Sequence, residues 1–388
     1  MTTPRQNELY ARLGRQLESS WHTRPSGQRG KNFFCRCGRP IFFPNSLCLG
    51  CNSPLGYAPE TGELHALDPG REQGSWTYLR ADASIANARR CANFDTPAGC
   101  NWLVDASETD PFCIACRLNR TIPNLDDEDN RRYWSLIENA KRRLVAQLLS
   151  LDLPVASKDA DPARGLAFDF LRKDGDEPVL TGHADGVITI NVEEADDVVR
   201  EKSRNAMHEP YRTLVGHLRH EIGHYYWDRL VRDSRWLAPF RELFGDERAD
   251  YAAALKRNYD EGPPADWVDR HISAYAASHP WEDWAETWAH YLHIVDGLDT
   301  ALGFGLSATD LDTSVDRFKR DDLYAPDDTQ AGRFVFFLNA WFELAYVLNE
   351  LSRSMGQPDF YPFVVSRAVA SKLHFVHLVI REARSDAG

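Results

Sequence analysis

Residues 211–230 read YRTLVGHLRHEIGHYYWDRL, and the interpretation of the whole chain starts from this stretch. His220 and His224 are four residues apart, about 40° on a helical wheel, so both imidazoles project from one helix face and can share a metal ion. Glu221 lies beside them and completes the pattern H-E-x-x-H. This pattern is typical of zinc sites in which the glutamate acts as a general base.

The residues around this pattern predict a helix that is largely buried. Gly223 leaves room for another element to pack closely, and apolar side chains cover other parts of the helix surface. His217 lies one turn before His220, and we expect it to support or pack against the ligands rather than to bind metal. Two ordinary solvated or core histidines are the alternative interpretation.

A catalytic zinc ion usually takes three protein ligands and leaves a fourth position for water. Two glutamates are candidates for the third ligand: Glu247 in FGDERADY and Glu282 in SAYAASHPWEDWAETWAHYLHI. We favour Glu282, because Pro280 suits the first position of a helix and so places Glu282 in its first turn. Glu286 would then lie one turn later on the same face, where its carboxylate can support a ligand.

Further polar residues near these ligands are candidates for supporting roles. Tyr275 precedes Glu282 by seven residues, and its phenol could donate to an oxyanion, with ordinary packing as the alternative. Asp228, Asp246 and His290 are candidate hydrogen-bond partners of the ligands, although each residue type is commonly just a polar surface group.

Eight cysteines precede residue 117 and form two sets of four. In a reducing compartment such spacing indicates metal binding rather than disulfides. The first cysteine cluster contains Cys35, Cys37, Cys48 and Cys51, and the second contains Cys91, Cys100, Cys113 and Cys116.

The first cysteine cluster has the spacing of a zinc ribbon, in which two close pairs meet through a hairpin. Gly38 and Asn52 follow the pairs and suit the turns that direct backbone amides toward sulfur. In the second cluster only Cys113 and Cys116 are close, while Cys91 and Cys100 arrive from separate loops. We expect one structural zinc ion in each cluster, against the alternative of thiols buried as small hydrophobes.

Composition excludes several classes of protein. The chain has 388 residues, of which 43% are apolar, so most of it can fold around a core. No run approaches the roughly 18 apolar residues of a membrane span, and the first residues lack a secretory signal, so we expect a cytoplasmic protein without a membrane partner. A net charge of −13 argues against nucleic acid as a partner.

Helical periodicity dominates after residue 117. Asp127 to Leu151 carries an apolar stripe, and two short strands are expected at Leu166–Leu171 and Gly186–Val192. We expect the second strand, GVITINV, to offer an edge to which an extended peptide can pair. Further helices are predicted at 195–204, 209–233, 246–259, 265–277, 281–295, 329–354 and 362–383.

These motifs resemble those of zinc-binding metallopeptidases that carry an N-terminal zinc ribbon. The resemblance covers about residues 30–380 and is carried by FFCRCGRPIFFPNSLCLGC, CNWLV, GHLRHEIGHYYW and HPWEDWAETWAHYLHI. The pattern Y-x6-E-x-x-A-E at Tyr275, Glu282, Ala285 and Glu286 is similar to that of lethal-factor-type peptidases within the gluzincin group. There the first glutamate is a zinc ligand and the tyrosine assists the transition state, which favours Glu282 over Glu247.

The expected fold class is therefore α+β, with a small β cysteine-rich region before a mainly helical, zincin-like domain that has a short β-sheet. The expected boundaries are an N-terminal helix and linker at 1–30, the zinc ribbon at 31–58, a second four-cysteine module at 59–124 and the peptidase domain at 125–388.

The expected function is hydrolysis of peptide bonds in a peptide or protein substrate. His220, His224 and Glu282 would hold a catalytic Zn²⁺ whose bound water loses its proton to Glu221, while Tyr275 stabilises the oxyanion. The two cysteine modules would be structural or would recruit a protein. The alternative is a zinc-ribbon binding or regulatory protein whose helical part is a scaffold. Metal content distinguishes the two, because only a peptidase needs a third zinc ion.

Overall fold

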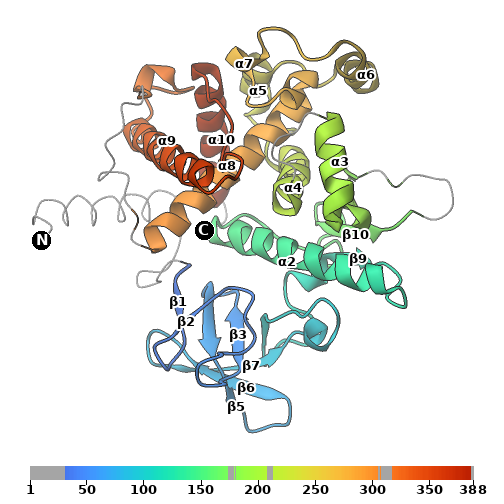
Figure 1. Ribbon diagram of the computed structural model, residues 1–388, viewed down its shortest axis with the longest axis vertical. Helices are drawn as coiled ribbons and strands as arrows, with labels where there is room; N and C mark the ends of the chain where they lie inside the picture. The colour runs from blue at the N-terminus through green and yellow to red at the C-terminus, as the bar shows by residue number, and fades with distance from the viewer. Residues whose placement is uncertain are drawn as a thin grey trace, which may run out of the picture. The chain divides into compact units, whose positions relative to one another are not determined.

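The computed structural model describes residues 31–173, 179, 181–207, 213–304, 306 and 317–385, so the N-terminal segment expected at 1–30 lies outside the described residues. The chain separates into two compact units, one ending at Val199 and one running from Arg200 to the C-terminus. Figure 1 labels the elements of both units. Each unit is considered by itself below.

The first part of the N-terminal unit is built from short antiparallel strands. The hairpin of β1 (Phe33–Phe34) and β2 (Pro40–Ile41) carries the first cysteine pair, and β3 (Leu55–Ala58) pairs with β4 (Glu63–Ala66). A four-stranded sheet follows in sequential order. It contains β5 (Asp68–Pro69), β6 (Ser75–Leu79), β7 (Ile85–Arg90) and β8 (Leu103–Asp105).

Helix α2 (Glu128–Ser150) and a second four-stranded sheet complete this unit. Asp127 caps α2 by accepting a hydrogen bond from the Asn130 amide, and the predicted apolar stripe is buried. Lys141 of α2 lies over the rings of Phe168 and Phe170 in the sheet. The strands, in sheet order, are β11 (Gly182–Ala184), β12 (Val187–Asn191), β10 (Ala167–Leu171) and β9 (Asn119–Thr121).

The expectation that the GVITINV strand offers a free edge is wrong. This segment forms β12, which pairs with β11 on one side and with β10 on the other. Both rows of its backbone hydrogen-bonding groups are therefore used inside the sheet, and β12 cannot accept a further strand.

The described residues of the C-terminal unit form helices joined by loops and contain no strand. After α3 (Asp197–Met207), which spans the division between the units, its helices are α4 (Leu214–Leu230), α5 (Leu237–Phe244), α6 (Tyr251–Glu261), α7 (Trp267–Arg270), α8 (Pro280–Gly303), α9 (Ala331–Ser354) and α10 (Arg367–Ser385). The helix predicted at 265–277 is interrupted, because His271 takes an extended conformation after α7 and a short 3-10 turn follows at Tyr275–Ser278.

Aromatic side chains form the core of the helical unit around α4 and α8. Tyr226 of α4 stacks on Trp288 of α8 with ring centroids 4.9 Å apart, and Trp284 lies 5.6 Å from Trp288. A Cβ atom built on Gly223 would lie 3.0 Å from the Ala285 Cα atom, so the glycine lets α8 approach α4 closely. This contact sets the distance between the two helices that carry the candidate metal ligands.

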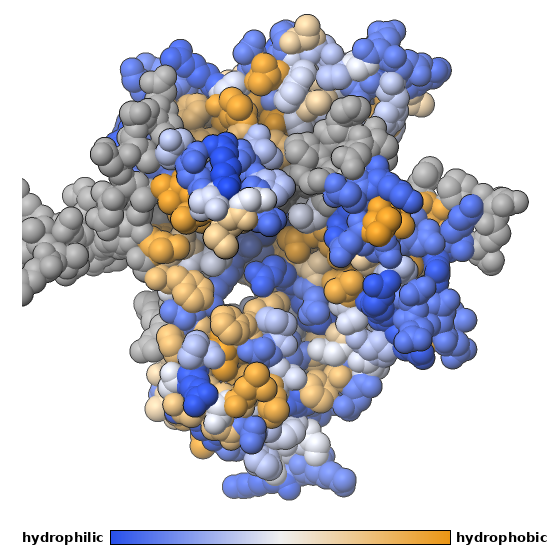
Figure 2. All heavy atoms as spheres, viewed as in Figure 1, coloured by the Kyte–Doolittle hydropathy of each residue, from blue (hydrophilic) through white to orange (hydrophobic). Residues whose placement is uncertain are grey.

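Among the described residues, α9 is the one helix long and apolar enough to cross a membrane, and half of its apolar window is buried within the protein. A core helix has the same composition, so the feature is weak evidence for a span. Figure 2 shows hydrophilic residues over much of the visible face, with apolar residues in small separate groups. The predicted α+β fold class, with a cysteine-rich region before a mostly helical part, is confirmed.

Candidate metal centres

Among the described residues, three groups of side chains have the donor atoms and spacing of metal sites. In each group the ligand atoms lie within 4.8 Å of one another. Two groups are the first and second cysteine clusters, and the third consists of His220, His224 and Glu282, named here the His/Glu cluster. All eight cysteines are free of disulfides.

The first cysteine cluster is built by the turns that the sequence predicted. Gly38 and Asn52 both take positive φ angles, of 83° and 59°, which direct the chain back past the sulfur atoms. The Sγ atoms of Cys35 and Cys51 are 3.5 Å apart. Burial raises the pKa of Cys35 to about 12, so four thiolates at this place need a cation to balance them.

The second cysteine cluster is assembled by a hairpin. Cys91 directly follows β7, Cys100 lies shortly before β8, and Cys113 and Cys116 stand at the short 3-10 turn Cys116–Leu118. All four are buried, and burial raises the pKa of Cys113 well above its ordinary value. The cluster is therefore closed to water, as a structural zinc site requires.

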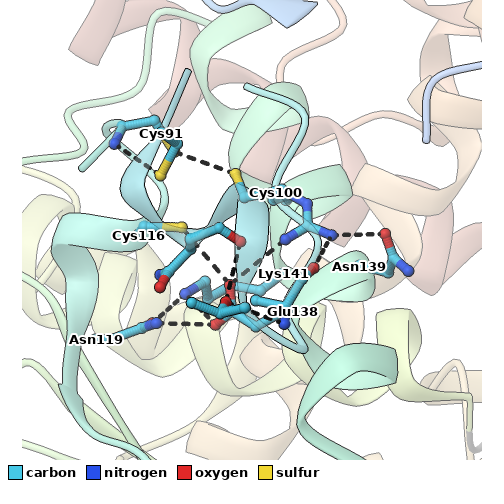
Figure 3. A network of polar contacts seen from close by, with 12 residues as sticks. Cys91, Cys100, Cys116, Asn119, Glu138, Asn139 and Lys141 are labelled. Atoms are coloured by element: carbon cyan, nitrogen blue, oxygen red, sulfur yellow. Dashed lines mark hydrogen bonds and ion pairs between the residues drawn. The ribbon is translucent and has the colours of Figure 1, made fainter. Parts of the chain in front are cut away.

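A buried ion network of α2 lies against the second cysteine cluster (Figure 3). The Cys116 sulfur is 3.9 Å from Glu138 Oε2, and Lys141 Nζ donates to Glu138 Oε1 at 2.6 Å. Arg142 Nη1 lies 3.7 Å from Glu138 Oε2, and Lys141 also donates to Asn119. Four thiolates, an ionised Glu138 and one divalent ion carry three negative charges, of which Lys141 and Arg142 can offset two.

The His/Glu cluster combines side chains from α4 and α8. His220 and His224 come from the middle of α4, whose first turn is capped by Thr213. Glu282 lies in the first turn of α8, after Pro280, as the sequence predicted, and it is only 1% exposed. Glu282 Oε2 is 2.9 Å from His220 Nε2 and 3.6 Å from His224 Nε2.

The donor atoms of this cluster fit a divalent metal ion. Glu282 Oε2 is buried and has no hydrogen bond to any described residue, although both imidazoles are close. Two nitrogen atoms and one oxygen atom that converge in this way can share one ion. Two imidazoles and one carboxylate are also a common donor set for zinc with an open position.

The charges of the site depend on one another. Burial opposes charge on Glu282, but His224 and His220 outweigh it and hold the pKa of the carboxyl well below its usual value. Burial also opposes charge on His220, yet Glu282 and Glu286 raise its pKa well above the ordinary value. Metal binding must therefore displace a proton from this cluster, since imidazole ligands bind in the neutral form.

Glu286 orients the first histidine. Its Oε1 atom is 2.7 Å from His220 Nδ1, and its Oε2 atom accepts a hydrogen bond of 2.6 Å from Ser273. The imidazole plane is thereby fixed with Nε2 toward Glu282, an arrangement that raises the basicity of a metal ligand. On the other ligand, the ring of Trp281 lies 4.1 Å from the ring of His224.

The carboxylate of Glu221 lies beside the cluster and close to His217. His217 Nε2 lies 3.2 Å from Glu221 Oε1, whereas Oε2 is buried without a hydrogen-bond partner among the described residues. Burial opposes its charge, but His217 and the ligand histidines outweigh burial and hold the pKa of Glu221 below its usual value. One oxygen of an ionised carboxylate is thus held, and the other is left for a water molecule.

The remaining predicted residues lie at different distances from the cluster. The ring of Tyr275 is 5.9 Å from that of His220. Glu247, the other candidate for third ligand, is instead paired with Arg241 at 2.9 Å. His290 is buried and bonds to Tyr361, and it acts electrostatically on Glu286.

The other two candidate supporting residues form pairs away from the ligands. Asp228 pairs with Arg232, and Asp246 pairs with Arg248.

Sequence reasoning missed several residues around the cluster. Tyr251 donates to Glu282 Oε1 at 2.6 Å, and Lys372 of α10 holds Asp283, the neighbour of Glu282, at 2.6 Å. Neither lies at a helical spacing from Glu282, so periodicity could not reveal them. The spacing of four residues between His217 and Glu221 is the one such signal that the sequence does carry.

Two family models and several relatives match this chain. A family model described as "Putative zinc-binding metallo-peptidase" matches residues 130–379, and a zinc-ribbon domain model matches residues 32–127. Uncharacterized proteins of Mycobacterium bovis and Mycobacterium tuberculosis are each 42% identical over 358 residues, which cover 92% of this chain and 97% of theirs. No solved structure matches the chain significantly. The chain thus belongs to the zinc-binding metallo-peptidase family and carries that family's helical part behind an N-terminal zinc ribbon.

Proposed function

We propose that the protein is a zinc-dependent metallopeptidase of the gluzincin type, with His220, His224 and Glu282 as the metal ligands. The observation that carries this proposal is the convergence of two imidazole nitrogens and one buried carboxylate oxygen within 4.8 Å of one another. They lie beside a glutamate with one buried, unpartnered oxygen. A helix with two ordinary core histidines would have satisfied these polar atoms within the protein.

The residues of the chain divide the chemistry among them. Zinc, when bound, supplies a Lewis acid and lowers the pKa of its bound water toward 7. Glu221 Oε2 takes a proton from the attacking water and later returns it to the leaving amine, while His217 holds Oε1. Tyr275 donates a hydrogen bond from its hydroxyl to the oxyanion that develops on the scissile carbonyl. The substrate class is a peptide or protein.

The two cysteine clusters supply structure in this proposal. A site with four thiolates has no open position for water, so its zinc contributes folding free energy rather than a nucleophile. The chain would then hold three zinc ions, one catalytic and two structural. Free thiols in both clusters also fit the reducing conditions of the cytoplasm.

The decisive experiment is Glu221→Gln in the full chain, assayed on a mixture of peptides with zinc content measured in parallel. Hydrolysis should fall by at least about 100-fold, the usual contribution of a general base, while three zinc ions remain bound. Asp228→Asn on the same helix is the control and should keep full activity, because its carboxylate pairs with Arg232.

The same measurements test the alternative function. A zinc-ribbon binding protein should hold two zinc ions, with no change in His220→Ala. Undiminished hydrolysis in Glu221→Gln would also remove the metallopeptidase proposal.

A further inference from the structure

The two oxygens of the Glu282 carboxylate have different surroundings. Oε2 faces His220 Nε2 and His224 Nε2 and has no hydrogen bond to any described residue. Oε1 accepts a hydrogen bond of 2.6 Å from the hydroxyl of Tyr251. One oxygen is therefore available to an ion, and the other is occupied by a neutral donor from a different helix.

Tyr251 lies on α6, whose start is connected to the start of α8, the helix that carries Glu282. It is the first residue of α6, whose cap Asp250 accepts from the Ala253 amide. The imidazole of His279 joins the two helix starts: its Nδ1 accepts from the Trp281 amide in α8, and its Nε2 lies 3.1 Å from the Ala249 carbonyl before α6. The buried side chain of His279 therefore fixes the start of α6, which carries the phenol, against the start of α8, which carries the carboxylate.

The surroundings of the ring also favour a positioning role. The ring of Tyr251 lies 5.2 Å from that of His279 and 6.1 Å from that of Trp281, and it is 39% exposed. A tyrosine that only filled space would be expected to place its hydroxyl toward solvent. Here the hydroxyl instead turns to a carboxylate that is almost fully buried.

We propose that Tyr251 is a positioning residue for the metal-ligand carboxylate: by holding Oε1, it leaves Oε2 alone to bind the ion. A carboxylate that binds through one oxygen occupies a single position and leaves the remaining ones for water and the substrate carbonyl. This inference rests on the proposed function, because it concerns the metal ligand Glu282.

The test compares Tyr251→Phe with Tyr259→Phe in the full chain. Tyr259 lies in the same helix and is 57% exposed, so it is a matched control. Zinc affinity is measured by chelator competition, and the visible spectrum is recorded after replacement of zinc by Co²⁺. Subtracting the spectrum of the His220→Ala protein isolates the His/Glu cluster from the cysteine clusters.

Tyr251→Phe should weaken zinc binding at this cluster by about 10- to 100-fold, as the loss of an outer partner of a ligand usually does. Its Co²⁺ spectrum should change in intensity, since the released Oε1 can reach the ion and raise its coordination number. Tyr259→Phe should match the wild type in both measurements.

Two outcomes would overturn the inference while leaving the proposed function intact. One is a Tyr251→Phe protein with wild-type affinity and spectrum. The other is weaker affinity with an unchanged spectrum, which would indicate general packing. Failure of the proposed function looks different, because wild type and His220→Ala would then hold the same amount of metal.

Discussion

The cysteine clusters and the His/Glu cluster differ in the number and type of ligand atoms that they offer to a metal ion. Each cysteine cluster supplies four sulfur atoms, and in the second cluster all four are buried. The His/Glu cluster supplies three donors, and next to them lies an unpartnered oxygen of Glu221. Four thiolates complete the coordination of zinc, whereas three ligands and an adjacent base leave one position for chemistry. The number and type of donors thus differ as they would between a structural site and the proposed catalytic one.

The environments of the clusters differ as well. The second cysteine cluster lies against Glu138 and Lys141, so charge balance connects it to α2. The His/Glu cluster is instead bordered by the ring of Trp281 and by the Glu286 carboxylate, which orients His220. We therefore expect that loss of metal from the cysteine clusters would destabilise the fold around them. Loss of metal from the His/Glu cluster would instead abolish activity.

The largest expected effect is on folding, and it should differ between the two cysteine clusters. Cys48→Ser should expose only the hairpins around residues 31–58. Cys113→Ser should also destabilise α2, because the buried Glu138 of this helix lies 3.9 Å from the Cys116 sulfur and its surroundings depend on the cluster. Structural zinc contributes on the order of 10 kcal/mol to folding in small domains, and unpairing a buried charge costs about 3–5 kcal/mol.

Hydrogen exchange resolved by peptide measures both changes. Ser84→Ala, in an exposed turn of the same unit, is the control. In both cysteine variants the helical unit should keep its own zinc and its protection. An α2 that stays fully protected in Cys113→Ser would show that the ion network does not depend on the metal.

The next effect concerns the third ligand. Glu282→Ala should reduce zinc affinity of the His/Glu cluster by more than about 100-fold, because it removes a ligand rather than a ligand's partner. Activity should be lost in parallel. Glu247→Ala should leave metal and activity unchanged and affect only the ion pair with Arg241. Zinc content by mass spectrometry distinguishes the two, and the reverse pattern would assign the ligand role to Glu247.

The smallest effect is expected from His217, which acts through Glu221. His217→Ala should lower kcat by about tenfold, since a hydrogen bond to a charged group contributes about 1.5–3 kcal/mol. KM and zinc content should stay constant, and His217→Gln, which keeps a donor, should recover part of the rate. His183→Ala in the other unit is the control. A rise in KM alone would place His217 in substrate binding.

Local patterns predicted a large part of the fold. The apolar stripe in α2 was visible because helix periodicity depends on residues within a few positions. The prediction of one continuous helix at 265–277 was wrong, because the apolar pattern gives no sign of the extended conformation at His271. The edge role of β12 was wrong for a similar reason, because strand order is set by partners such as β11.

The sequence by itself determined the chemistry that the chain can carry. The spacing of His220 and His224, the cysteine pairs and the glycine at 223 are local, and helix or turn geometry converts them directly into shared faces. Only the tertiary structure decided which distant groups complete each site. Tyr251 reaches Glu282 and Glu138 reaches Cys116 because separate elements pack together, and such contacts follow no sequence period.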